Sequence, residues 1–155
     1  MSNPNIAAFS ALFAKDITEL SELASFQPPP TGVYNMDVSV DFKVINKKPS
    51  VEARFKIKDT VDATEPEGKL KVAKPGDEFS IAFILVKSDG SPNDVAEGKM
   101  REFLEYFIEY AQTTNVEELV TGKIKDVAIT ATVKTKADKD DDDRFRVDVK
   151  DIVIA

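Results

Sequence analysis

The longest helical pattern in the chain covers residues 96–111. Apolar side chains recur there at positions i, i+3, i+4 and i+7, a spacing that places them in one stripe along a helix. The stripe comprises Val95, Met100, Phe103, Leu104, Phe107, Ile108 and Ala111. Pro92, followed by Asn93 or Asp94, supplies the turn and the cap in front of it. The pattern therefore predicts a helix that buries one face.

A second helical pattern covers residues 3–25, where Ile6, Phe9 and Phe13 begin another apolar stripe. Prolines 28–30 follow, and a proline run cannot continue a helix. We expect an N-terminal amphipathic helix with a proline-rich connector in residues 1–29. This helix either packs on its own domain or forms an arm that contacts a neighbouring subunit or another protein.

Five segments between and after these helices are typical of β-strands. They cover residues 34–44, 51–57, 79–86, 127–133 and 145–154. The segment 79–86 is apolar on both faces, which favours the most buried strand of the sheet. In the last segment the alternation changes phase at Lys150 and Asp151, which predicts a β-bulge.

The order of these elements predicts the fold of residues 30–155. Three strands, one helix and two further strands follow one another, and this is the order of a five-stranded Greek-key barrel. The fold class is therefore predicted to be mainly β: a β-barrel with a helix between strands 3 and 4, preceded by the N-terminal helix.

Composition excludes most catalytic chemistry. The 155 residues contain neither cysteine nor histidine, which removes disulfides, thiolate metal sites, the commonest general base and the commonest metal ligand. No phosphate-binding glycine motif or nucleophile elbow occurs. We therefore expect a protein without enzymatic activity, cofactor or metal. Without a long apolar run or a signal peptide, it is expected in the cytoplasm and away from membranes.

Basic residues on the predicted strands and turns are candidates for binding nucleic acid. They are Lys43, Lys47, Lys48, Arg54, Lys56, Lys58, Lys134, Lys136, Arg144 and Arg146. Tyr34, Tyr106, Tyr110 and Phe55 are the rings on which bases would stack, although a place in the core is the alternative for each. The net charge of −7 opposes such binding, and lysine-rich strand faces are also common as solvated surfaces.

The acidic run at residues 138–143 has two interpretations. Its carboxylates are a candidate divalent-ion site, but their spacing does not match a calcium loop. A solvated hairpin tip is the preferred interpretation.

Several short segments in this order resemble a known family. They are Gly32-Val33-Tyr34, Gly98-Lys99, Glu117-Glu118-Leu119, Gly122-Lys123 and Val149-Lys150-Asp151-Ile152. Residues 30–155 are similar to small bacteriophage proteins of replication and recombination that resemble single-stranded DNA-binding proteins with the oligonucleotide-binding (OB) barrel. In that barrel the second and third strands, together with the loops between strands 1 and 2 and between strands 4 and 5, form the ligand surface.

The resemblance implies a protein that coats single-stranded DNA without sequence preference and recruits replication or recombination proteins. It also implies the cytoplasm of an infected host cell as its location. Such relatives commonly carry an acidic tail, whereas this sequence ends in Ile152-Val153-Ile154-Ala155. The alternatives are a phage structural or assembly protein that forms homo-oligomers through the N-terminal helix, and an inhibitor that presents Asp140 to Asp143 as a nucleic-acid decoy.

Overall fold

A computed structural model describes residues 28–64, 70–137 and 145–155. The helix predicted for residues 3–25, the acidic run 138–143 and Arg144 lie outside these ranges.

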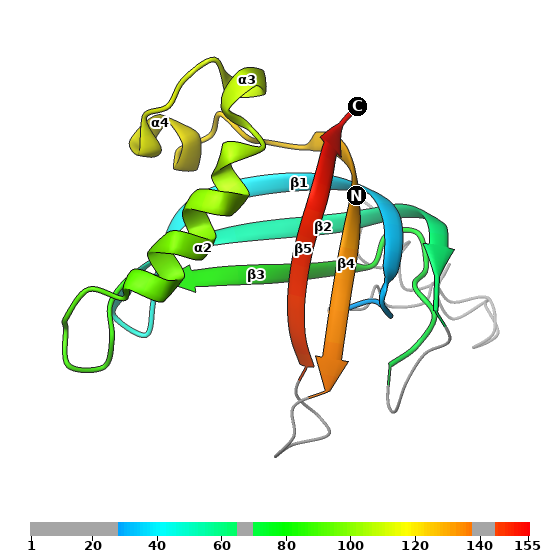
Figure 1. The fold of residues 1–155 in the computed structure, drawn as a ribbon, viewed down its shortest axis with the longest axis horizontal. Helices are drawn as coiled ribbons and strands as arrows, with labels where there is room; N and C mark the ends of the chain where they lie inside the picture. The colour runs from blue at the N-terminus through cyan, green and yellow to red at the C-terminus, as the bar shows by residue number, and fades with distance from the viewer. Residues whose placement is uncertain (1–27, 65–69, 138–144) are drawn as a thin grey trace, which may run out of the picture.

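The described chain is mainly β, as predicted (Figure 1). Its strands are β1 (Gly32–Ile45), β2 (Lys48–Ala63), β3 (Glu78–Ile84), β4 (Val127–Ala137) and β5 (Phe145–Ile154). Its helices are α2 (Asp94–Glu105), α3 (Ile108–Ala111) and α4 (Val116–Val120). The predicted position of a helix between the third and fourth strands is confirmed by α2.

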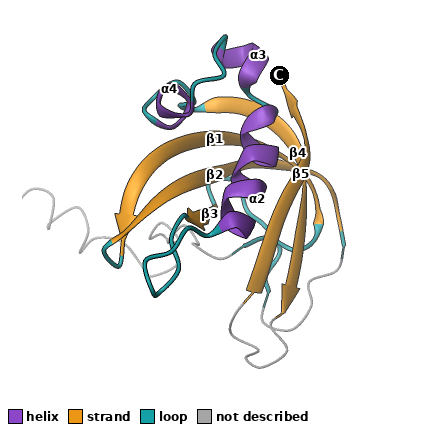
Figure 2. Ribbon diagram, turned by 60° about the vertical axis from the view of Figure 1, so that its left-hand side comes forward, coloured by secondary structure: helices purple, strands orange, loops and turns teal. Residues whose placement is uncertain are grey.

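The strands form one antiparallel sheet in the order β3-β2-β1-β4-β5. The sheet is strongly curved, and β4 and β5 cross the direction of the other three strands (Figures 1 and 2). A closed barrel was expected, but in the described ranges β3 and β5 do not pair and remain the two edges of an open sheet. The helix α2 lies across this opening, and its Phe103 ring packs 5.8 Å from the ring of Phe83 on β3.

Strands β1 and β2 form a long hairpin around a two-residue turn. Asn46 and Lys47 both have positive φ angles, 50° and 65°, which is the geometry of a type I′ turn. The register shifts twice near the start of β1, where the hairpin bends. Gly32 is needed there, because a Cβ atom would lie 2.3 Å from the carbonyl oxygen of Asp62. Strand β2 extends to Ala63, beyond the predicted strand segment 51–57.

The core lies against the middle of the sheet. Tyr34, Met36, Val38 and Val40 of the central strand β1 are fully buried, in agreement with their alternation. The prediction that residues 79–86 form the most buried strand is wrong. Strand β3 is an edge, and although Phe79 and Phe83 are buried, Ser80 and Ala82 face solvent.

The helix α2 begins where the sequence predicted. The Asn93 side chain accepts a hydrogen bond from the Ala96 amide and donates one to the Ile84 carbonyl, so the helix start is fixed to the end of β3. The helix ends earlier than residue 111, because a turn at Tyr106 and Phe107 separates α2 from α3. At this break the Phe107 side chain is buried in the core.

The predicted bulge in β5 is confirmed. The register between β4 and β5 shifts between Thr130 and Thr132, opposite Asp151, whose φ is 53°. Residues on the two sides of the bulge therefore keep their apolar side chains on the core side despite the change of phase, and Ile152 is buried.

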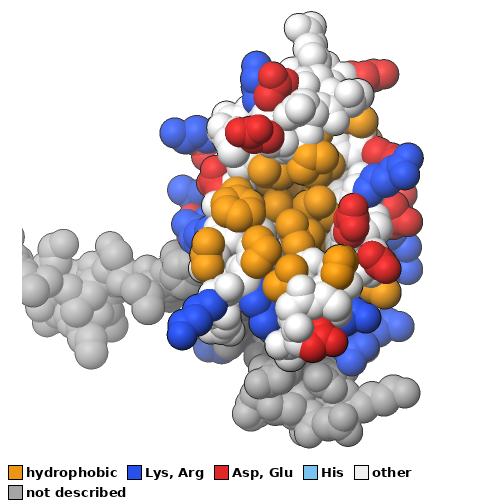
Figure 3. Space-filling view, turned by 90° about the vertical axis from the view of Figure 1, so that its left-hand side faces the viewer, with side chains coloured by type: hydrophobic (Ala, Val, Ile, Leu, Met, Phe, Trp, Pro, Cys, Tyr) orange, Lys and Arg blue, Asp and Glu red, His pale blue; other side chains and the backbone are white. Residues whose placement is uncertain are grey.

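One end of the molecule exposes apolar side chains. Phe42 and Val44 continue the inward alternation of β1 beyond the core and are 49% and 68% exposed. Val116 of α4 is also exposed. Figure 3 looks onto the end that carries the β1–β2 turn, the start of α2, and α4; apolar side chains gather in the middle of this face and charged ones at its margin. We call this surface the apolar end. No helix in the described ranges is long and apolar enough to cross a membrane.

Candidate nucleic-acid interface

The predicted basic residues of β1 and β2 lie on the outer face of the sheet. Lys43, Arg54, Lys56 and Lys58 are exposed there, and we call them the strip. The strand register places carboxylates on the same face, since Asp37 is opposite Lys56, and Glu78 of β3 is opposite Lys56 on its other side. Asp41 and Glu52 also face each other across the hairpin. Four cations thus share this face with four carboxylates.

Three of the four strip cations form ion pairs. The amine of Lys43 lies 3.0 Å from a carboxylate oxygen of Glu52, and Arg54 contacts the same oxygen at 3.6 Å. The amine of Lys58 lies 2.8 Å from a carboxylate oxygen of Asp37. These pairs are half-exposed and contribute little to stability, but they occupy the cations that a phosphate would contact.

The remaining predicted basic residues in the described ranges occupy two places. Lys47 and Lys48 belong to the β1–β2 turn and the start of β2, away from the hairpin of β4 and β5. Lys134, Lys136 and Arg146 lie on that second hairpin, where Lys136 pairs in register with Arg146. In the sheet order, β1 and β4 separate β2 from β5, so the basic residues of β2 and β5 lie on strands that are not neighbours.

Tyr34 lies in the core. Its ring has 0% exposure, and its hydroxyl donates a 2.6 Å hydrogen bond to the Pro30 carbonyl. Burial raises the pKa of this phenol, because the phenolate would lose its hydration. The ring is therefore inaccessible to a base, and Phe55, fully buried and stacked 4.9 Å from Phe79, is inaccessible as well.

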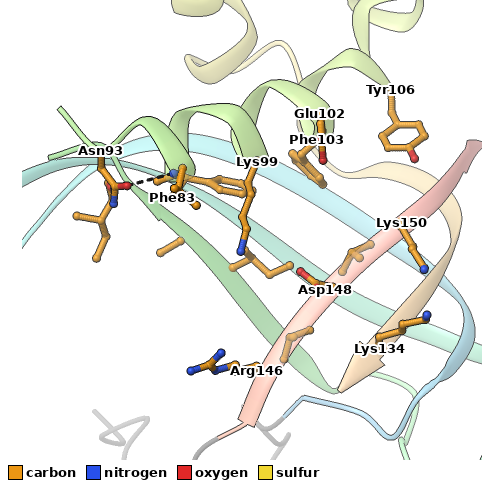
Figure 4. Close-up of a pocket in the computed structure, with 17 residues that line it drawn as sticks. Phe83, Asn93, Lys99, Glu102, Phe103, Tyr106, Lys134, Arg146, Asp148 and Lys150 are labelled. Atoms are coloured by element: carbon orange, nitrogen blue, oxygen red, sulfur yellow. Dashed lines mark hydrogen bonds between the residues drawn. The ribbon is translucent and has the colours of Figure 1, made fainter. Parts of the chain in front are cut away.

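A groove of about 850 Å³ lies between α2 and β5, at the opening between the two edge strands (Figure 4). We call it the α2–β5 groove. Its lining includes apolar side chains of three elements: Ile81 and Phe83 of β3, Phe103 of α2, and Val147 and Val149 of β5. These residues are buried or packed against the core, so the groove has an apolar floor that is continuous with the interior.

The charged lining of the α2–β5 groove is mainly basic. Lys99, Lys134, Arg146 and Lys150 meet two carboxylates, Glu102 and Asp148, which leaves a surplus of two positive charges. In Figure 4, Lys99 extends from α2 toward β5, and the amines of Lys134 and Lys150 approach each other. Among the ion pairs of the described ranges, none includes a groove cation. The neighbouring Lys150 amine lowers the pKa of Lys134, since two ammonium groups repel.

Tyr106 forms one wall of the groove at the end of α2. Its side chain is 40% exposed, and its hydroxyl accepts a 3.3 Å hydrogen bond from the amide of Asp151 at the β5 bulge. The bulge thus presents an amide that holds the ring between α2 and β5. Tyr110, the other exposed tyrosine, lies on α3 and does not line the groove.

Sequence reasoning missed the basic groove residues Lys99 and Lys150, and it assigned Val95 to the buried stripe. Val95 is 69% exposed and lines the groove. One signal was available: Val95, Lys99, Glu102 and Tyr106 are spaced as a second stripe beside the buried one. Which strand faces this stripe depends on the tertiary fold, and no local pattern reports it.

Within the described ranges, no cluster of acidic side chains is arranged to hold a metal ion. Comparisons with protein-family models, with curated proteins and with solved structures found no match for this chain. The function is therefore inferred from the residues of the molecule itself.

Proposed function

We propose that the protein is a non-catalytic single-stranded DNA-binding protein of the phage type, with an OB-like domain in residues 30–155 that coats DNA during replication or recombination. The strand order, with a single connection through α2 between β3 and β4, supports this proposal. An OB barrel is a five-stranded Greek-key barrel that is only partly closed, and an open seam between β3 and β5 is compatible with it.

The observation that carries the proposal is the positive charge of the described strands β4 and β5, without the acidic run that connects them in the sequence. Lys134, Lys136, Arg146 and Lys150 are exposed on these strands, where they outnumber two carboxylates: Asp148, which lies opposite Lys134 in register, and Asp151, which attracts Lys134. This is the reverse of the chain's net charge of −7. A binding protein with an acidic total needs a local basic surface of this kind, because phosphate contacts provide most of the non-specific affinity for nucleic acid.

The direct test is fluorescence anisotropy of a labelled oligo-dT titrated with the full-length protein. We expect binding at about 50 mM salt that weakens steeply as salt increases, because binding releases counterions from the phosphates and a higher salt concentration makes this release less favourable. Duplex DNA is expected to compete poorly, since its stacked bases are not open to a groove wall. If micromolar protein does not bind oligo-dT at about 50 mM salt, the proposal is wrong.

The apolar end favours a second function, that of a phage structural or assembly protein. Phe42, Val44 and Val116 expose apolar surface that a subunit contact would bury. Light scattering of the full-length protein distinguishes the two functions when it is compared with a Phe42→Ser, Val44→Ser variant. An ordered assembly that the variant loses, in a protein without DNA affinity, would support the structural function.

A further inference from the structure

The α2–β5 groove is the described surface whose chemistry best complements a single strand. Its four cations exceed its two carboxylates, whereas the four cations of the strip share their face with four carboxylates. A phosphate approaching Lys43, Arg54 or Lys58 of the strip must displace Glu52 or Asp37 from an existing ion pair, and Lys56 lies between Asp37 and Glu78 in register. A phosphate approaching the groove meets amines without such a pair.

The pair Lys134 and Lys150 gives the clearest reason for an anion. Their amines approach each other in Figure 4, the carboxylate opposite Lys134 in register, Asp148, forms no ion pair with it, and the attraction of Asp151 for Lys134 is weaker than the effect of Lys150. An anion placed between two ammonium groups relieves their repulsion and contacts both. The backbone of a nucleic acid carries such an anion at every nucleotide.

Tyr106 and the apolar floor provide surfaces for bases beside these amines. The hydroxyl of Tyr106 is fixed by the Asp151 amide, which leaves the ring with few orientations and part of it open to solvent. Such a ring can stack on a base at little entropic cost. The β5 segment from Arg146 to Lys150 spans roughly 14 Å, so the groove accommodates a short stretch of a strand.

We infer that, given the proposed function, single-stranded DNA binds in the α2–β5 groove, with phosphates on Lys134, Lys150 and Arg146 and a base against Tyr106, and not along the outer face of β1 and β2. This inference rests on the proposed function and names the binding path within it. The path follows the seam between β3 and β5 alongside α2.

Two double variants of the full-length chain distinguish the groove from the strip as the DNA-binding path. Lys134→Glu with Lys150→Glu reverses two charges in the groove, and Arg54→Glu with Lys56→Glu reverses two charges on the strip. All four positions are exposed, and each pair makes the chain four charges more negative, so a long-range effect of net charge is equal in both. Circular dichroism of the free proteins confirms that each variant keeps the fold.

At about 0.1 M salt we expect the groove variant to lose on the order of 100-fold in affinity for labelled oligo-dT. Its log–log salt slope is expected to be about 1.4 less steep, as for two lost phosphate contacts on a single strand. The strip variant is expected to stay within about 3-fold of the wild type, because charges distant from the groove are screened at this salt concentration. An equal loss in both variants, or a larger loss in the strip variant, overturns the groove as the path.

Substitutions of Tyr106 test the base contact separately. Tyr106→Ala is expected to weaken binding by roughly 5- to 150-fold, which corresponds to one lost stack, while Tyr106→Phe keeps the ring and remains within about 3-fold. Equal affinities of the Ala and Phe variants overturn the stacking contact.

Absence of oligo-dT binding by the wild type instead overturns the proposed function itself. A groove variant that loses self-association in light scattering but keeps its DNA affinity shows that a second copy, and not DNA, occupies the groove.

Discussion

The strip and the α2–β5 groove contain four cations each, yet they differ in what surrounds those cations. On the strip, Lys43, Arg54 and Lys58 form ion pairs with Glu52 or Asp37, and Lys56 faces a carboxylate on each neighbouring strand. In the groove, the cations come from three elements that are distant in sequence, and the amines of Lys134 and Lys150 crowd each other instead. The number of basic residues in a segment therefore says less about a binding surface than the groups placed opposite them.

The two surfaces also differ in their connection to the core, and this difference gives the largest expected effect. Phe103 lines the groove and contacts the rings of Phe55, Phe83 and Phe107 at centroid distances of 5.3–6.0 Å. Phe103→Ala is expected to lower the free energy of unfolding by about 3–5 kcal/mol, because it removes a buried ring and leaves a cavity. Urea unfolding followed by circular dichroism measures this change.

The matched control lies on the strip. Arg54→Ala removes an exposed side chain and is expected to change the free energy of unfolding by less than about 0.5 kcal/mol. If Phe103→Ala costs less than about 1 kcal/mol, the groove floor is not part of the core, and the two surfaces are energetically alike.

Local patterns were sufficient for the features that depend on neighbours in sequence. Three features each depend on residues that are close in sequence: the alternation of β1, the cap at Asn93, and the bulge at Lys150 and Asp151. The ion pairs of the strip were also accessible from the sequence. A two-residue turn at Asn46 and Lys47 fixes the hairpin register near the turn, and that register makes Glu52, which lies opposite Asp41, the diagonal neighbour of Lys43.

The open sheet and the groove depend on contacts that no local pattern encodes. Residues 79–86 read as the most buried strand because they are apolar on both faces, but β3 is an edge whose second face is only partly covered. Tyr106 and Asp151 are joined by a hydrogen bond across 45 residues, and this contact links the end of α2 to β5. Lys99 could not be grouped with Lys150 before that approach was known.

The titration of Lys134 gives a smaller effect that is specific to the groove. Its folded pKa is lowered by Lys150, so the repulsion costs stability at neutral pH, and this cost disappears as the pH rises through the lowered pKa. In Lys150→Gln, the pKa of Lys134 is expected to return toward its ordinary value. Bound oligo-dT is expected to raise this pKa in the wild type, because phosphate stabilises the ammonium form.

Side-chain NMR of Lys134 across the alkaline range measures these shifts. A wild-type pKa that already equals that of the Lys150→Gln variant would mean that the two amines do not interact. A pKa that oligo-dT leaves unchanged would place the phosphates elsewhere, although DNA is bound.

The smallest expected effects come from removing one carboxylate on each surface. Glu52→Gln removes the partner of Lys43 and Arg54 and is expected to reduce the free energy of unfolding by less than about 1 kcal/mol. If DNA follows the groove, the affinity of the Glu52→Gln variant for oligo-dT differs from that of the wild type by less than about 2-fold, because the released cations are not on the path.

Glu102→Gln, the same substitution in the groove, is expected to increase the affinity for oligo-dT by about 2- to 5-fold, since it adds to the positive surplus. Anisotropy titrations of both variants under one salt condition compare them directly. If the affinity for oligo-dT increases more in Glu52→Gln than in Glu102→Gln, the ion pairs of the strip are what weakens DNA binding. The DNA path would then lie on β1 and β2.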